Sequence, residues 1–431
     1  MELGWIRAFQ PVWRPAPGGP GSAGAAAGRP LDWACFIAPR HPLTEALLAA
    51  FAPQGGPSAT MVALGKRWDA GGRDTLLDGV HAALERGGPL SLVHSGAAGA
   101  ALVRSVHLEH PEQPCVIVQI PEISAAATWA AREATSHDRG FREIRYDAAG
   151  QRHRPELVPL LLPPHLPAAA MGLPISPDQV CLVTGGGKGV GFECALALAH
   201  ATGCRLALLD RAAPATDAEV ARNLERLRAA GVPHAYVHAD VCAADMTAAA
   251  IRRIRRELGG VVALLHCAGR NAPALFTDIT VEALEAHLAP KAEGLANVLA
   301  AVETRALRLL VAFSSVLART GHGGQAHYAL ANERLGLLMR RLRAELPHCR
   351  CVTIEWSVWS ETGIAARLGA ADAILRAGIT PIPTAAGTDW FLRIAACPAP
   401  PPDVVVTGRM GQLWTMPILR SSAPQGPLPG Q

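Results

Sequence analysis

The segment FSSVLARTGHGGQAHYALAN, residues 313–332, connects an apolar run to a helical pattern through a glycine-rich loop. The apolar run, Leu307–Phe313, is typical of a buried strand. Ser314 and Ser315 follow it directly. Ligands of an open α/β sheet bind at the carboxyl ends of the strands, so these two serines are predicted to lie where a ligand would sit.

A helix is predicted after the glycine-rich loop Gly321–Gly324. Tyr328 and Asn332 are four residues apart in this helix, which places both side chains on one face. A serine at the end of a strand and a tyrosine on the next helix can converge on one oxygen atom. The pair Ser315 and Tyr328 is therefore suited to polarising and protonating a carbonyl group.

A tyrosine has an ordinary pKa of about 10, so at neutral pH it needs a cationic neighbour to serve as a tuned acid. Short-chain dehydrogenases usually supply a lysine four residues after the tyrosine, but here that residue is Asn332. The chain contains only the lysines Lys66, Lys188 and Lys291. Lys291 lies upstream of the serines, in a helical pattern that begins near Val281.

This arrangement of a lysine, then a serine, then Tyr-x-x-x-Asn resembles the ketoreductase domains of modular polyketide synthases and, more distantly, of fatty acid synthases. These domains belong to the short-chain dehydrogenase/reductase superfamily. The spacings from Lys291 and Ser315 to Tyr328 match that family. The resemblance implies reduction of a β-keto thioester carried on the phosphopantetheine arm of an acyl carrier protein, with neighbouring synthase domains as further partners.

The resemblance also implies a role for each residue. Tyr328 would donate a proton to the carbonyl oxygen, and Ser315 would orient that oxygen. Lys291 would lower the pKa of the tyrosine and hold the nicotinamide ribose. Asn332 would anchor a water that relays protons, although it could instead only bridge backbone groups. Ser314 is expected to be structural.

The predicted fold class is α/β, a doubly wound parallel sheet of the Rossmann, short-chain dehydrogenase type. Seven apolar runs alternate with helical patterns after a proline-rich linker, Pro163–Pro177. The predicted strands are 179–184, 205–210, 234–239, 261–267, 307–313, 350–355 and 403–407, and two helical patterns lie near 364–377 and 384–396. We assign residues 173–416 to a catalytic, cofactor-binding subdomain and residues 417–431 to a disordered tail or linker.

Residues 1–172 also show a βαβ rhythm, with strands expected at 33–38, 61–64, 90–94 and 115–120, helices at 75–86 and 98–107, and a hairpin at 141–161. No Gly-x-Gly-x-x-Gly motif follows any of these strands. The segment is therefore predicted to be a truncated, Rossmann-like structural subdomain that binds no dinucleotide. A subdomain of this kind precedes the catalytic one in polyketide ketoreductases.

The segment TGGGKGVG joins the first strand of the catalytic part to its helix. Glycines in such a loop let the chain turn and approach a pyrophosphate, and the helix N-terminus supplies N–H groups to it. The candidate cofactor residues here are Thr184, Gly185, Gly186, Gly187, Lys188, Gly189, Val190 and Gly191.

The identity of the cofactor depends on Asp210 and Arg211, at the end of the second strand. An acid there usually holds the ribose 2′-hydroxyl of NAD, whereas an arginine accommodates the 2′-phosphate of NADPH. Lys188 could add a second cation. We favour NADPH as the cofactor, and the acid at Asp210 leaves NADH as the alternative.

Two further motifs match the family at the cofactor. Asp240 and Val241 match its adenine contact, although Asp240 could simply cap the next helix. The segment His266-Cys267-Ala268-Gly269 matches its HAAG-type motif. His266 itself is expected to pack at a strand end rather than to take part in catalysis.

The substrate groove and its lid are expected to include Gln325, Trp356, Trp359 and Gly363, with core packing the alternative for the tryptophans. Reductases of one stereochemical outcome carry Leu-Asp-Asp after HAAG, but Asn271-Ala272-Pro273 stands here. Those of the opposite outcome carry a tryptophan eight residues before the tyrosine, where this chain has Thr320. The stereochemistry therefore stays open, with a slight preference for the tryptophan-type outcome.

The bulk composition narrows the function classes. The net charge of +4 over 431 residues and the absence of a basic tract interleaved with aromatics give little support to nucleic-acid binding. Ten scattered cysteines without a CxxC pair indicate free thiols, no metal site is predicted, and no apolar run reaches the length of about 18 residues that spans a membrane. We expect a cytoplasmic protein.

Three other functions are alternatives to this interpretation of the sequence. A catalytically silent ketoreductase-like module would keep the fold but oxidise no NADPH. A free-standing reductase of small ketones would have no need of residues 1–172. Epimerase or dehydratase chemistry would normally use Tyr-x-x-x-Lys, which the chain lacks.

Overall fold

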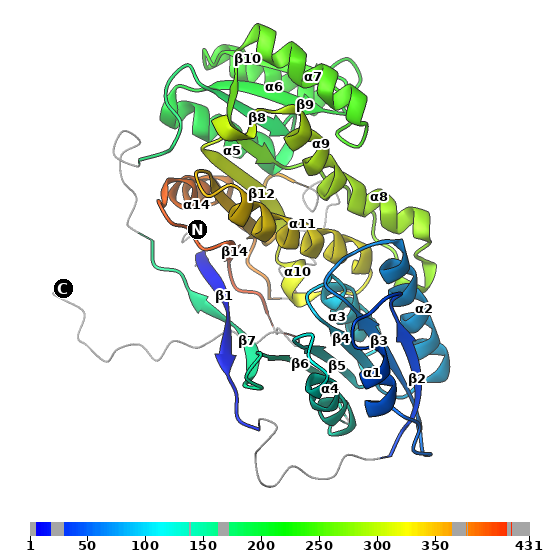
Figure 1. Cartoon of the computed structure of the whole chain (residues 1–431). Coiled ribbons are helices and arrows are strands. Elements are labelled where there is room, and N and C mark those ends of the chain that lie inside the picture. Colours follow the sequence, from blue (N-terminus) through cyan, green and yellow to red (C-terminus); the bar gives the residue numbers. More distant parts are fainter. Residues whose placement is uncertain are drawn as a thin grey trace, which may run out of the picture.

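The computed structural model describes residues 6–18, 30–137, 139–162, 172–363, 376, 378–411 and 415. All the named strands belong to one sheet with the order β10-β9-β8-β11-β12-β13-β14-β1-β7-β6-β5-β4-β3-β2. The sheet runs through two lobes, one from each half of the chain (Figure 1). Several predictions concern segments outside the described residues, namely parts of the linker 163–177, most of the helical pattern 364–377 and the tail 417–431.

The strands of the second half confirm the predicted doubly wound sheet. They are β8 (Val180–Thr184), β9 (Arg205–Asp210), β10 (His234–His238), β11 (Val261–His266), β12 (Leu309–Ser315), β13 (Arg350–Trp356) and β14 (Asp403–Thr407). All these strands pair in parallel. The first three, β8, β9 and β10, are added towards one edge of the sheet, and β11 to β14 are added on the other side of β8. Ser314 and Ser315 were predicted to follow β12, but they are its last two residues.

Helices cover both faces of this sheet. They are α5 (Gly189–Thr202), α6 (Ala218–Ala229), α7 (Ala244–Glu257), α8 (Val281–Lys291), α9 (Glu293–Ala301), α10 (Leu317–Thr320), α11 (Ala326–Glu345) and α14 (Thr384–Ala396). Successive residues of a strand point to opposite faces. Cys181 and Val183 of β8 accordingly pack with α5, α6 and α14, whereas Val180 and Leu182 pack with α7, α9 and α11.

The first half forms the smaller lobe. Its strands are β2 (Asp32–Ile37), β3 (Ser58–Leu64), β4 (Leu90–His94), β5 (Cys115–Gln119), β6 (Phe141–Tyr146) and β7 (Arg152–Pro159), and its helices are α1 (Thr44–Ala50), α2 (Ala70–Arg86), α3 (Ala100–Glu109) and α4 (Ala125–Thr135). β2 to β6 are parallel, and β6 and β7 form the predicted hairpin. The sequence did not predict α1 and α4.

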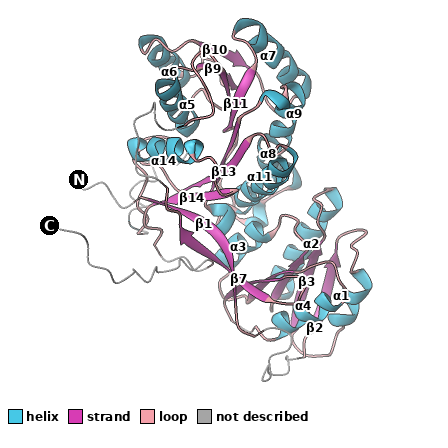
Figure 2. Ribbon diagram, turned by 60° about the vertical axis from the view of Figure 1, so that its left-hand side comes forward, coloured by secondary structure: helices cyan, strands magenta, loops and turns pink. Residues whose placement is uncertain are grey.

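The two lobes are joined in two ways. β1 (Arg7–Pro15) pairs antiparallel with both β14 and β7, so it lies between the lobes (Figure 2). In addition, apolar residues of α2 and α3 pack in one core with residues of α8 and α11, for example Val103 and Val106 with Leu288 and Leu330. The smaller lobe thus lies directly against the helix that carries Tyr328. No described helix is both long and apolar enough to cross a membrane.

Candidate active site

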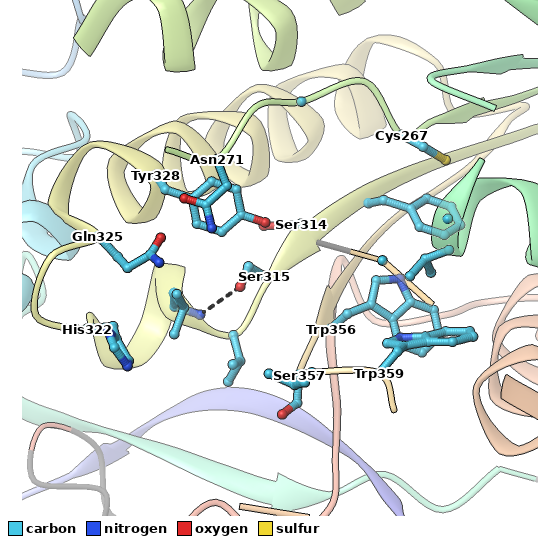
Figure 3. A pocket seen from close by; sticks show the side chains of 18 of the residues that line it. Cys267, Asn271, Ser314, Ser315, His322, Gln325, Tyr328, Trp356, Ser357 and Trp359 are labelled. Atoms are coloured by element: carbon cyan, nitrogen blue, oxygen red, sulfur yellow. Dashed lines mark hydrogen bonds between the residues drawn. The ribbon is translucent and has the colours of Figure 1, made fainter. Parts of the chain in front are cut away.

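A cavity of about 810 Å³ opens at the carboxyl ends of β8, β9, β11, β12 and β13. It brings together most of the site residues predicted from the sequence: Gly185, Lys188, Gly189, Val190, Gly191, Asp210, Arg211, Cys267, Gly269, Lys291, Ser315, Gln325, Tyr328, Trp356, Trp359 and Gly363. Figure 3 shows Tyr328, Ser315 and Gln325 at one end of the cavity, and Trp356, Trp359 and Cys267 at the other.

The other predicted residues lie behind the cavity wall or in an adjoining recess. Asp240, Val241 and Ala268 line a smaller cavity of about 60 Å³, which shares Gly185, Asp210, Arg211 and Gly269 with the large one. Thr184, Gly186, Gly187, His266 and Asn332 line neither. The recess continues the large cavity beyond the glycine loop, where the adenine contact was expected.

The glycine loop needs glycine at several positions for its backbone conformation and its close packing. Gly185 and Gly189 have φ of +63° and +66°, a region that favours glycine. A Cβ on Gly185 would lie 2.8 Å from the backbone nitrogen of Ala268, and one on Gly191 would lie 2.9 Å from the Sγ of Cys267. Gly185 and Gly191 therefore pack against Cys267 and Ala268, which follow β11, at distances that leave no room for a side chain.

Two carboxylates accept hydrogen bonds from backbone N–H groups in and near this loop. Asp210, which is almost fully buried, accepts hydrogen bonds from the N–H of Gly187 and of Ala212, both at 3.0 Å. Glu219 accepts one from the N–H of Gly189 at 3.1 Å. Both carboxylates therefore add negative charge around the loop.

The two cations near the loop differ in their partners. Lys188 forms an ion pair with Asp217, the N-cap residue of α6, and this contact lowers the pKa of Asp217. Its charge is therefore partly compensated, which its predicted role as a second phosphate contact did not anticipate. Arg211 is exposed, lines both cavities, and has no carboxylate within ion-pair distance among the described residues. Arg211 is thus the cation available to a ligand here.

Ser315 and Tyr328 face the same space from neighbouring elements. The Oγ of Ser315 accepts a hydrogen bond from the N–H of Leu317 at 3.3 Å, so its own proton can be donated elsewhere (Figure 3). Burial raises the pKa of Tyr328, and hydrogen bonding towards the side chains of Asn332 and Ser315 offsets part of this rise. The pKa of Tyr328 is thus raised, whereas a lowering by Lys291 was expected, and Lys291 is not among the groups that shift it. The tyrosine therefore holds a proton at neutral pH.

Lys291 reaches the site from the end of α8. Its side chain is buried, and its Nζ donates to the backbone oxygen of Phe313 at 2.5 Å. A Cβ on Gly269 would lie 2.8 Å from the Cε of Lys291, so the lysine passes across a glycine. Burial lowers the pKa of Lys291 to about 8, against a smaller opposite effect of Cys267. The ammonium is held next to β12, close to the serine-bearing end of the strand.

His266 fixes the backbone behind this lysine. Its Nδ1 lies 2.8 Å from the Oγ1 of Thr184, and its Nε2 lies 3.1 Å from the backbone oxygens of Pro290 and Lys291. Burial, followed by the charge of Lys291, lowers the pKa of His266 to about 3, so the ring is neutral. The residue connects two strands to the end of α8, which agrees with the packing role predicted for it.

Asn332 is completely buried in α11. Its Nδ2 donates to the backbone oxygen of Tyr328 at 2.8 Å, while its Oδ1 has no hydrogen-bond partner among the residues described. Ser314 donates to the backbone oxygen of Asn332 at 3.2 Å, which ties β12 to the helix. Asn332 therefore bridges backbone and still has an acceptor free for a water.

The two tryptophans serve both the core and the cavity. Trp356 and Trp359 are 6% and 3% exposed, and their rings pack edge to face with centroids 5.1 Å apart. Both belong to the core beneath α14 and both line the cavity. Gln325, the N-cap residue of α11, also lines the cavity. The groove and core interpretations of the tryptophans are thus compatible.

Sequence reasoning missed several residues of the cavity wall. Asn271, noted only as a departure from a fingerprint, lines the same cavity as Tyr328 (Figure 3). Leu108, from the first half of the chain, and Thr415, from its end, also line it, and Thr415 donates to the backbone oxygen of Thr320 at 2.6 Å. No local motif marks such residues, because tertiary packing alone brings them to the site.

Comparison with known proteins agrees with this geometry. Residues 180–361 match the family model described as the KR domain. Residues 180–361 form a KR domain. The matched residues run from the first strand of the doubly wound sheet, through the glycine loop and Tyr328, to the segment after the two tryptophans.

Relatives of the KR domain are polyketide synthases. The chain is 29% identical over 222 residues to polyketide synthase PksN of Bacillus subtilis strain 168, which covers 50% of the chain and 4% of PksN. It is 32% identical over 260 residues to the spectinabilin polyketide synthase system protein NorB of Streptomyces orinoci, which covers 59% of the chain and 11% of NorB. The chain thus spans only a small part of the length of these relatives.

A solved ketoreductase has the same fold. PlmKR1, the ketoreductase from the first module of phoslactomycin biosynthesis in Streptomyces sp. HK803, matches with a TM-score of 0.76 and 24% sequence identity over 94% of each chain. Because this match covers the first half of the chain as well, the lobe that precedes the KR domain belongs to the shared fold.

Proposed function

We propose that the KR domain reduces the β-keto group of a thioester, bound to an acyl carrier protein, to a β-hydroxyl group with NADPH. The observation that carries this proposal is the convergence of Ser315, Tyr328 and Lys291 on one cavity that begins at a glycine loop. A hydroxyl pair at one end of a cavity and a dinucleotide-type loop at the other suit hydride transfer to a carbonyl. The test is whether the protein oxidises NADPH when a β-keto thioester is added.

The cofactor would extend along the cavity floor. The backbone of Gly185, Gly189 and Gly191 would hold the pyrophosphate, and Asp240 and Val241 would contact the adenine in the smaller recess. Arg211 would contact the 2′-phosphate. Bound there, the reduced nicotinamide supplies the hydride.

Side chains of the protein would bind and protonate the carbonyl oxygen of the substrate. Ser315, whose oxygen already accepts a hydrogen bond from the N–H of Leu317, would donate a hydrogen bond to the substrate oxygen and fix its position, while keeping its own proton. Tyr328, which stays protonated because burial raises its pKa, would donate its proton to that oxygen as charge develops. Lys291 would stabilise the tyrosinate left behind, and Asn332 would hold a water through its unpartnered oxygen.

We further propose the division of labour suggested by the sequence. Residues 1–172 would form a structural subdomain, and residues 173–416 the catalytic one. The carrier protein and neighbouring synthase domains would be the partners in a cytoplasmic assembly. The alternatives are a silent KR-like module, which the complete set of Ser315, Tyr328 and Lys291 disfavours, and a free-standing reductase of small ketones.

Deprotonation of Lys291 is expected to lower kcat/KM as the pH rises through about 8. Burial has lowered its pKa, so above that pH the lysine is neutral and no longer stabilises a tyrosinate. Tyr328 cannot cause the decrease, because its own pKa is raised. Initial rates at saturating NADPH across the alkaline range test this. A rate that stays constant until the pH reaches the ordinary tyrosine pKa of about 10 would contradict it.

Asp210→Asn is expected to raise the preference for NADPH over NADH about tenfold, since removing one negative charge near a phosphate is worth roughly 1.4 kcal/mol at intermediate dielectric. The amide oxygen can still accept from Gly187 or Ala212, so the loop keeps part of its bracing. Dissociation constants of both cofactors, measured by fluorescence titration without substrate, give the ratio. An unchanged ratio would mean that this carboxylate acts only on the backbone.

A further inference from the structure

Two separate segments contribute amide side chains to the cavity that Tyr328 also lines. One follows β11 and includes Asn271, and the other precedes α11 and includes Gln325. Both amide side chains line the cavity (Figure 3). The Oδ1 of Asn271 and the Oε1 of Gln325 are buried, and neither has a hydrogen-bond partner within the described part of the chain. Two buried amide oxygens without a partner, on residues that line the cavity, are placed to accept hydrogen bonds from a ligand.

Within the described part of the chain, backbone hydrogen bonds of Ala272 and Ala274 hold the segment that carries Asn271. The N–H of Ala272 donates to the Nε2 of His287 at 3.1 Å, and the backbone oxygen of Ala272 lies 2.8 Å from the Nε2 of His327. The N–H of Ala274 donates to the backbone oxygen of Gly324 at 3.0 Å. Ala272, Pro273 and Leu275 are exposed, so these contacts fix the first part of the segment, whereas the buried side chain of Phe276 anchors its end in the core.

A carboxylate from the smaller lobe joins the two segments. Glu109, the last residue of α3, accepts a hydrogen bond from the N–H of Phe276 at 2.9 Å through Oε2. Through Oε1 it accepts one from the N–H of Gly324 at 2.8 Å. One side chain thus bridges the segment that carries Asn271 and the segment that carries Gln325.

α3 is itself anchored to the catalytic helix at its other end. Glu333 of α11 accepts from the N–H of Gly99 at 2.8 Å and of Ala101 at 3.2 Å, at the start of α3. In the middle of α3, Arg104 donates to the backbone oxygen of Ala318 at 3.0 Å, and Ser105 accepts from the N–H of His322 at 3.2 Å. The helix is therefore a rigid support for the loop in front of Tyr328.

We propose that Glu109 is a positioning residue for the reaction, through which the smaller lobe holds Asn271 and Gln325 in a fixed arrangement around Tyr328. The two amides then bind the acyl chain so that one face of its β-keto group meets the hydride. Glu109 touches neither substrate nor cofactor in this scheme. The inference rests on the proposed reductase function and assigns to the smaller lobe a part in orienting the substrate.

The test compares Glu109→Ala and Glu109→Gln with Glu112→Ala. Glu112 is a suitable control because its side chain is 75% exposed and its ion-pair partner is His110, away from the cavity. Glu109→Ala is expected to lower kcat/KM for a racemic 2-methyl-3-oxo thioester about 10- to 100-fold, the loss typical of a small misplacement of bound groups. Glu109→Gln, with one acceptor oxygen instead of two, should fall between this variant and the wild type.

Two further readouts separate positioning from a merely structural role. The minor diastereomer of the product should increase in Glu109→Ala, while the dissociation constant of NADPH stays at the wild-type value, because the glycine loop is untouched. A lower melting temperature with unchanged KM and product ratio would overturn the proposal. Equal effects of Glu112→Ala would also overturn it.

The activity of the wild type distinguishes a failure of the positioning role from a failure of the proposed reductase function. A wild type that reduces the thioester, together with an unaltered Glu109→Ala, rejects the positioning role alone. A wild type that reduces no thioester rejects the proposed function. In that case hydrogen exchange of peptides 271–276 and 321–326 still decides the bracing, because exchange that is unchanged in Glu109→Ala would rule it out.

Discussion

Tyr328→Phe is expected to lower the rate of thioester reduction about 10²- to 10⁴-fold, the usual contribution of a general acid, and to leave the affinity for NADPH unchanged. Phenylalanine keeps the ring that packs in the wall and removes only the hydroxyl that would protonate the substrate oxygen. Burial raises the pKa of this hydroxyl, so the wild type holds the proton until substrate arrives. Single-turnover rates and a fluorescence titration with NADPH measure the two effects separately.

The chain offers a matched control in another of its three tyrosines. Tyr146 lies in β6, and its hydroxyl donates to Glu133 at 2.7 Å in the smaller lobe. Tyr146→Phe should cost about 1 kcal/mol of stability through this lost hydrogen bond and should leave turnover intact. If Tyr328→Phe kept the wild-type turnover, another group would have to supply the proton.

Ser315→Ala is expected to lower kcat about 10²- to 10³-fold, as does the loss of one donor to a developing oxyanion in other enzymes. The N–H of Leu317 already donates to this oxygen, so the serine proton is left to point at the substrate. The defect should appear mainly in kcat rather than in KM, because the oxygen carries most charge in the transition state. Steady-state kinetics with a soluble thioester give both constants.

The adjacent serine provides the comparison. Ser314 donates to the backbone oxygen of Asn332, so Ser314→Ala should chiefly affect the packing of α11 and reduce kcat much less. Equal losses in both variants would show that neither hydroxyl has a special position relative to the substrate.

The fold of the second half could be predicted because its strands are short apolar runs separated by long helical patterns. All seven predicted strands, from 179–184 to 403–407, correspond to β8 to β14. Two of the helices that were missed are too short to show a clear period: α10 has four residues and α1 has seven. α4 has 11 residues, one more than the predicted α3, and its length does not explain why it was missed. The antiparallel joint made by β1 could not be foreseen, because pairing partners far apart in sequence leave no local mark.

The candidate site, too, could be predicted from the sequence only in part. The glycine loop and the residues Ser315, Tyr328 and Lys291 stand in recognisable motifs or spacings, and the fold brings them to one cavity as expected. The pairing of Lys188 with Asp217 depends on where α6 begins relative to the loop, which the spacing alone does not give. Glu109 lies in a helix without any motif, and only the docking of the two lobes brings it to the cavity wall.

The smaller lobe therefore has a physical connection to the proposed chemistry. Its helix α3 supports the loop in front of Tyr328, and Leu108 of that helix lines the cavity. No Gly-x-Gly-x-x-Gly motif follows any of the strands β2 to β7 of this lobe, in keeping with a supporting role. The stereochemical outcome would then depend on the arrangement of Asn271 and Gln325, since neither known fingerprint is present in the sequence.

The most direct measurement is the loss of reduced-nicotinamide absorbance when a racemic 2-methyl-3-oxo thioester is added to the wild-type protein, with NADPH in one sample and NADH in the other. Our account predicts a loss with NADPH, a slower one with NADH, and a β-hydroxy thioester as product. No loss with either cofactor, although NADPH binds, would contradict a catalytic KR domain and favour a silent module that retains only the fold.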